Sequence, residues 1–237
     1  EQHDDWNPLD ASVLRDQRQA YDEMRERCPV AHSEFLGWSL FRHEDIAGVL
    51  ADTQTYSNES RFMAIPNGMD PPAHGRYREA LDSNFDPQQM ASAEPRAREI
   101  AQTLLKSALH IGEMEFIDDF AIPFALKTLC ALLGWPEHQW ECLSGWVHGS
   151  QQASFNNDPA AGKDLAIRFS EQVKANLSTH RAYPNEVADT TDVLLCTEVD
   201  GVRLEDDQIV SILRNWTAGH GTLAASLGIV VLHLAQQ

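Results

Sequence analysis

The sequence has few cysteines, few basic residues and no long apolar run, and each shortage excludes a class of protein. Its four cysteines form no C-x-x-C pair, which excludes the common zinc and dithiol motifs and predicts free thiols in a reducing compartment. Lysine and arginine number 18 against 36 aspartates and glutamates, so the formal net charge is -18. Because such a surface repels phosphate backbones, we expect no nucleic-acid partner.

Signals for membranes and for export are also missing. No run of about 18 apolar residues occurs, so we expect no membrane-spanning segment and no membrane partner. The start, Glu1–Trp6, is acidic and polar and lacks the basic and apolar regions of a signal peptide. These absences favour a cytoplasmic protein.

The 237 residues are 43% hydrophobic, which is enough for a packed core, and we expect a single domain over residues 1–237. Apolar spacing predicts a mainly α fold, a helical bundle with one small N-terminal β-hairpin at His32–Phe41 around Gly37. Thr53–Asp70 reads as a long loop, and such loops are often functional. Ile111–Ile117 is interpreted as an extended piece, and Asp200-Gly201 as a turn. Helices are expected at residues 10–27, 43–50, 88–109, 124–133, 137–155, 162–183, 187–197 and 204–235.

A first cluster of chemically capable residues follows the long loop. Pro71-Pro72 is expected to open a helix, because proline suits the first helical positions. His74 and Arg78 are four residues apart and therefore lie on one helical face, where they can clamp a carboxylate or a phosphate. A solvated basic helix face would show the same spacing.

A second cluster lies in the middle of the C-terminal helix, where Gly219 and Gly221 interrupt an apolar pattern. Each glycine in a helix interior costs roughly 1 kcal/mol relative to alanine, so something should offset that cost. Small residues let a flat or bulky group approach the backbone closely, and Thr217 and Thr222 add hydroxyls there. A close crossing of two helices would use the same residues.

Together the two clusters resemble motifs of the cytochrome P450 family. Asp70, Pro71, Pro72, His74 and Arg78 match the D-P-P-x-H-x-x-x-R helix of the bacterial members in full. Ala218, Gly219 and Thr222 match the A-G-x-[DE]-T-T helix in part, at a family-like separation. The Phe85-Asp86-Pro87 turn and the N-terminal hairpin also fit, so the resemblance covers nearly the whole chain and implies the N-terminal half of a cytochrome P450 fold.

This resemblance implies a haem-thiolate monooxygenase that uses haem b and dioxygen. His74 and Arg78 would bind a haem propionate, Ala218 and Gly219 would lie over the ring, and Thr222 would be the catalytic hydrogen-bonding hydroxyl. A hydrophobic small organic substrate would meet Phe62, Met63, Ile65 and Asn215. A ferredoxin- or flavin-type protein would donate electrons.

Two departures from the family pattern stand out. Gly221 replaces the acid that normally precedes the threonine, which suggests an altered proton route or a different chemistry. The F-x-x-G-x-x-x-C-x-G loop that supplies the iron ligand is absent from the 237 residues, and so is the E-x-x-R motif. We therefore expect no metal ligand within these residues, a chain that is incomplete, and no activity from these residues alone.

A second interpretation stays open beside the enzyme. Without the cysteine loop, the same helices would suit a non-catalytic ligand-binding or sensor module. That module would bind an apolar ligand and show no haem spectrum. An all-helical interaction protein, whose small residues serve packing alone, is a further alternative, and it would contain no cavity.

Overall fold

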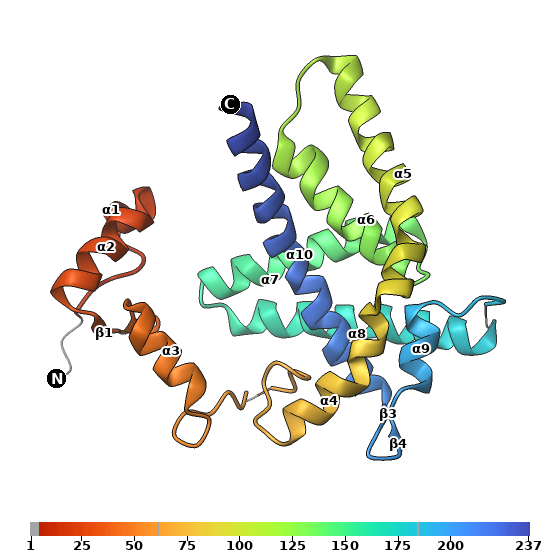
Figure 1. Cartoon of the computed structure of the whole chain (residues 1–237), viewed down its shortest axis with the longest axis horizontal. Coiled ribbons are helices and arrows are strands. Elements are labelled where there is room, and N and C mark those ends of the chain that lie inside the picture. The colour runs from red at the N-terminus through yellow and green to blue at the C-terminus, as the bar shows by residue number, and fades with distance from the viewer. Residues whose placement is uncertain (1–4, 61, 184) are drawn as a thin grey trace. The chain divides into compact units, whose positions relative to one another are not determined.

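The computed structural model describes residues 5–60, 62–183 and 185–237, with the side chains of residues 107 and 108 left aside. The chain divides into two compact units, residues 1–58 and residues 59–237, and each is described by itself (Figure 1). The single-domain expectation for residues 1–237 stays a prediction. Residues 1–4, part of the segment compared with a signal peptide, and Arg61 of the long loop lie outside the described residues.

The first unit contains short helices and the expected hairpin. Its elements are α1 (Ala11–Arg15), α2 (Gln17–Arg27), β1 (Val30–Ser33), β2 (Gly37–Leu40) and α3 (His43–Ala51). The strands are antiparallel, with His32 opposite Trp38, and Gly37 supplies the positive φ of +70° that the turn needs. The expectation of one unbroken helix over residues 10–27 is wrong. Asp16 leaves the helical conformation and its carboxylate accepts from the Gln19 amide, so a second helix starts there.

A small aromatic core holds the first unit together. Trp6, Met24 and Ala31 are buried, and Phe41 packs against them. The rings of Trp6 and Phe41 meet edge to face at 5.0 Å, a favoured aromatic geometry. Asp10 caps α1 as expected, because its side chain accepts from the Ser12 amide.

The second unit is a bundle of long helices. Its helices are α4 (Ala73–Asp82), α5 (Pro87–Ile111), α6 (Ile122–Leu132), α7 (Trp140–Phe155), α8 (Pro159–Ala182), α9 (Thr190–Cys196) and α10 (Asp206–Ala235). Short turns η1 (Ser83–Phe85), η2 (Phe116–Ala121) and η3 (Glu137–Gln139) connect them, and β3 (Glu198–Val199) pairs with β4 (Val202–Arg203). The mainly α prediction is confirmed.

Three local expectations for the second unit need correction. The Asp200-Gly201 turn is present as expected, but the expectation of a single hairpin is wrong, because this turn closes a second one, β3–β4, whose two-residue strands are too short to show alternation. Ile111–Ile117 is not an extended piece, because α5 continues to Ile111 and η2 begins at Phe116. Helices α8 and α9 start at caps that the spacing did not reveal, Asp158 and Asp189.

The core of the second unit lies where α10 packs against α6 and α8 (Figure 1). Its fully buried side chains include Leu126, Leu143, Leu177, Ile209 and Leu213. Beyond the core, α10 exposes apolar side chains, among them Ile229 at 69% and Leu232 at 61%. Among the described helices, α10 is the one that is long enough and apolar enough to cross a membrane, judged by length and composition only. An 18-residue window of α10 has a mean hydropathy of 1.5, and 11% of that window is buried. The expectation of no membrane span stays a prediction.

Candidate haem-contacting site

Helix α4 carries the first motif. His74 and Arg78 lie one turn apart on this helix; His74 is half-buried and Arg78 is exposed. A carboxylate oxygen of Asp82 lies 3.7 Å from the Arg78 guanidinium, and both side chains are more than half exposed. Because so exposed an ion pair is worth at most about 1 kcal/mol, the Arg78 guanidinium stays available to a stronger anionic partner.

Helices α4 and α10 are held together near this motif by two side-chain contacts. The Gln208 side chain of α10 donates a hydrogen bond of 2.8 Å to the Tyr77 hydroxyl of α4. Two turns further along α10, the rings of Phe85 and Trp216 meet at 4.9 Å with an interplanar angle of 71°. Phe85 belongs to the Phe85-Asp86-Pro87 turn, which was part of the resemblance to the family. This turn therefore fixes the end of α4 against α10, the helix that carries the second motif.

A cavity of about 260 Å³ lies between the two helices. Arg78, Leu81 and Phe85 line it from one side, and Asn215 and Trp216 line it from α10. The structure thus brings Arg78, a predicted cofactor-binding residue, and Asn215, a predicted substrate-binding residue, to one space although they are far apart in the sequence.

The second motif presents its small residues on an exposed face of α10. Ala218, Gly219 and Thr222 are all exposed, and no described atom lies within 4 Å of the position that a Gly219 Cβ would take. At Gly221 the equivalent position meets only the Gln151 side-chain nitrogen, at 3.9 Å. Within the described residues no second helix crosses at Gly219, so a close helix crossing does not account for this glycine.

The opposite face of the same helix is buried. Thr217 and His220 point into the bundle, where the Nδ1 atom of His220 lies 2.6 Å from the Thr217 carbonyl oxygen and donates to it. Burial lowers the pKa of His220, and nearby His148 lowers it further, so His220 is neutral at pH 7. A mostly apolar cavity of about 360 Å³ borders both faces: His220 and Trp216 line it from α10 and Leu129 lines it from α6, and Gly219, a predicted cofactor-binding residue, lines it too.

The loop segment from Phe62 to Ile65 is hydrogen-bonded to α10. Ser211 accepts from the Ile65 amide at 2.9 Å and donates to the Met63 carbonyl at 3.0 Å. Asn215 donates to the Ile65 carbonyl at 2.8 Å, and Arg214 donates to the Met63 carbonyl. Three polar side chains on one helix, those of Ser211, Arg214 and Asn215, therefore hold the loop that was predicted to touch the substrate.

The four predicted substrate-binding residues take different places. Ile65 is 4% exposed and belongs to the core, whereas Met63 is 52% and Phe62 is 78% exposed. Phe62 lines a third cavity, of about 440 Å³, together with Trp146 and Arg214. The roles of these residues and of Asn215 stay predictions. Ser211 and Arg214 were not predicted as site residues from the sequence. The feature that could have revealed them is their polar character within an otherwise apolar helix, just before the Ala218-Gly219 pair.

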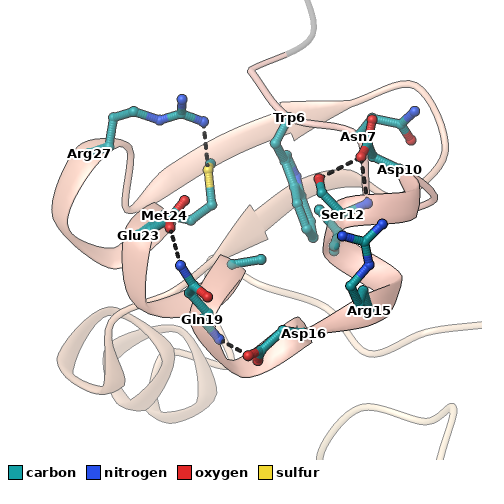
Figure 2. A pocket seen from close by; sticks show the side chains of 12 residues that line it. Trp6, Asn7, Asp10, Ser12, Arg15, Asp16, Gln19, Glu23, Met24 and Arg27 are labelled. Atoms are coloured by element: carbon teal, nitrogen blue, oxygen red, sulfur yellow. Dashed lines mark hydrogen bonds between the residues drawn. The ribbon is translucent and has the colours of Figure 1, made fainter.

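Two other side-chain groups serve the fold. In the first unit, a cavity of about 460 Å³ is lined by α1 and α2, whose polar groups largely bind one another, as between Gln19 and Glu23 at 3.0 Å (Figure 2). In the second unit, ligand-type atoms of His180, Asp189 and Asp192 lie within 4.8 Å of one another. The His180 ring binds Asp189 at 3.0 Å and Asp189 caps α9, which accounts for that arrangement.

Comparison with known proteins finds relatives that match most of this chain. No family model matches the chain. It is 30% identical over 223 residues to the erythromycin C-12 hydroxylase of Saccharopolyspora erythraea, covering 88% of this chain and 55% of that protein. It is 29% identical to the cyclomarin C epoxidase CymV of Salinispora arenicola, covering 90% of this chain and 58% of that protein. The chain thus spans little more than half the length of these relatives.

Solved structures give the same result for the fold. The chain matches the crystal structure of CalO2 with a TM-score of 0.77 at 26% identity, over 97% of this chain and 62% of that one. It matches a mutant of P450 EryK, solved in complex with erythromycin B, with a TM-score of 0.73 at 26% identity, over 85% of this chain and 54% of that one. Sequence relatives and fold agree: over about nine tenths of its length the chain is similar to cytochrome P450s, and it has the cytochrome P450 fold through the long helix α10.

Proposed function

We propose that the complete protein is a haem-thiolate monooxygenase that oxidises a hydrophobic small organic substrate with dioxygen and electrons from a ferredoxin- or flavin-type donor. One observation carries the proposal. The Arg78 helix lies against the helix of Ala218, Gly219 and Thr222, and the small residues of that second helix face open space.

The residues present fit a haem group. Among the described residues Arg78 has one weak, exposed ion-pair partner, Asp82, and half-buried His74 lies one turn away, so both can donate to propionate oxygens. Ala218 and Gly219 leave the face of α10 clear for a flat ring. When bound, haem supplies the iron at which dioxygen is activated, and a thiolate ligand favours cleavage of the oxygen–oxygen bond.

Thr222 has the role of a positioned hydroxyl. It lies one turn after Ala218 on the exposed face of α10, where its side chain is free to donate a hydrogen bond toward the dioxygen site. The neighbouring His220 is buried and donates to a backbone carbonyl, so it is not assigned a place in the proton route. We place the protein in the cytoplasm, as expected for an enzyme served by a separate electron donor.

The reduced carbon-monoxide difference spectrum of the complete protein, recorded with its intact mass, tests the proposal. A Soret band typical of thiolate-bound haem supports it. A complete protein that purifies without haem and still binds apolar ligands would instead support the non-catalytic ligand-binding module.

Substitutions on α4 sharpen this test. We expect His74→Ala and Arg78→Ala each to lower the haem-to-protein ratio several-fold, because each removes a donor to a charged propionate. Arg76→Ala is the matched control on the same helix, since Arg76 pairs with Asp200 at 2.9 Å and both side chains are largely exposed. Equal haem content in all three variants would contradict the assignment of His74 and Arg78.

A further inference from the structure

The cavity of about 440 Å³ beside Phe62 contains a cation without a counterion. It is bounded by α7, α8, α10 and the loop residue Phe62, and Arg214 reaches it from α10. Within the described parts of the chain, Arg214 forms no ion pair with a carboxylate; its one partner is the Met63 carbonyl oxygen. A guanidinium has five N–H donors, so most of them remain available to a ligand.

The surroundings of Arg214 make an unpaired charge costly. Arg214 is partly buried, and this desolvation lowers its pKa, because the guanidinium is less well solvated than one on the open surface. Trp146 and Phe62 line the same cavity and provide apolar walls. The Nε1 donor of Trp146 has no acceptor among the described residues. Because this atom is buried and not open to a ligand, Trp146 is assigned only the role of an apolar wall.

One carboxylate does line the cavity, that of Asp158. Its Oδ1 atom accepts from the Ala160 and Ala161 amides, at 3.1 Å and 3.0 Å, and thereby caps α8. Among the described residues Asp158 forms no ion pair with Arg214, so the guanidinium has no carboxylate in direct contact.

The position of Arg214 along α10 connects this cavity with the second motif. Arg214, Ala218 and Thr222 follow one another at intervals of four residues, so they lie along one side of the helix. At 1.5 Å per residue, Arg214 and Thr222 are about 12 Å apart along the axis. A ligand held at Arg214 by one end can extend along this side toward Thr222.

We infer that Arg214 is a substrate-anchoring residue and that the substrate is an apolar organic acid, held by its carboxylate. A carboxylate can accept two parallel hydrogen bonds from a guanidinium, which gives both charge neutralisation and orientation. A cavity of this size lies within the range of small-molecule sites. The assignment of this anion site to the substrate rests on the proposed function.

Three probes of equal size test the inference: phenylbutyrate, phenylbutanol and phenylbutylamine, each titrated calorimetrically into the complete protein. We expect phenylbutyrate to bind at least about tenfold more tightly than phenylbutanol, the usual scale for a hydrogen bond to a charged group. The amine should bind most weakly. Equal affinities for the acid and the alcohol would overturn the inference.

Substitutions test whether Arg214 is the residue that produces the preference for phenylbutyrate over phenylbutanol. Arg214→Gln should abolish the preference for the acid, while Arg214→Lys, which keeps the charge, should retain part of it. Arg168→Gln on α8 is the matched control, because it removes an exposed arginine that pairs with Asp164. Asp158→Asn, which removes the negative charge lining the cavity, should strengthen phenylbutyrate binding. An unchanged acid preference in Arg214→Gln would overturn the assignment.

The same samples separate this inference from the proposed function. A protein that shows the haem spectrum but does not prefer the acid refutes the inference alone. A protein without haem that prefers the acid through Arg214 refutes the monooxygenase proposal and leaves the anion site standing.

Discussion

The side-chain amide of Asn215 donates a hydrogen bond of 2.8 Å to the backbone carbonyl of Ile65, which precedes it by 150 positions. Ser211, one turn earlier on α10, binds the amide of the same residue. The helix of the second motif therefore determines where the loop from Phe62 to Ile65 lies, and with it the position of the predicted substrate-contacting residues.

The first prediction concerns this attachment. Ser211→Ala should lower the free energy of unfolding by about 1–3 kcal/mol, because it leaves the Ile65 amide without its acceptor in a buried place. Urea unfolding measures the change. Ser226→Ala, on the exposed part of the same helix, removes only a bond to the Thr222 carbonyl and should change stability by less than about 0.5 kcal/mol. Equal effects of both substitutions would show that Ser211 does not anchor the loop.

Gly221 gives a second prediction. Among the described residues a Cβ at this position meets the Gln151 side-chain amide alone, at an ordinary contact distance of 3.9 Å, so alanine fits without a clash. Gly221→Ala should stabilise the protein by about 0.5–1 kcal/mol, because alanine favours the helix. If the missing acid alters the proton route, Gly221→Asp in the haem-loaded protein should raise the product formed per dioxygen consumed, while Gly221→Ala should not. Unchanged coupling in the aspartate variant would refute the altered route.

His220 predicts a pH dependence of stability. Burial lowers its pKa, so the folded protein binds fewer protons than the unfolded chain at mildly acidic pH. The stability of the neutral form is fully present above the unfolded pKa of about 6.5 and is lost as pH falls below it. We expect the free energy of unfolding to fall between about pH 7.5 and 5.5, and to fall less in His220→Asn. His138→Asn, at an exposed position in η3, is the control and should keep the wild-type slope.

The cysteines give a fourth prediction. Burial raises the pKa of the Cys130 thiol to about 12, so it stays protonated and unreactive near neutral pH. Cys142 and Cys196 are exposed. A thiol reagent at about pH 8 should label these two in the folded protein and reach Cys130 only after unfolding, which peptide mass mapping would show. Rapid labelling of Cys130 in the folded state would mean that its environment is more open than the structure shows.

The sequence by itself determined the helical fold, because apolar spacing and proline or glycine punctuation are local signals. It also revealed the two motifs, since His74 and Arg78 must share a face on any helix, and Gly219 must clear space wherever it lies. Helix starts at Asp158 and Asp189 were missed because a cap depends on the conformation of a single residue, which apolar periodicity does not report.

Only the tertiary structure decided which of these residues meet. Ile65 and Phe62 look alike as apolar loop residues, yet Ile65 is buried and Phe62 is exposed, because hydrogen bonds from Ser211 and Asn215 draw the Ile65 backbone onto α10. Arg214 has no neighbour in the sequence that marks it as unpaired. That it meets no carboxylate among the residues that the structure describes follows from packing among helices distant in the sequence, and a linear pattern carries no information about that environment.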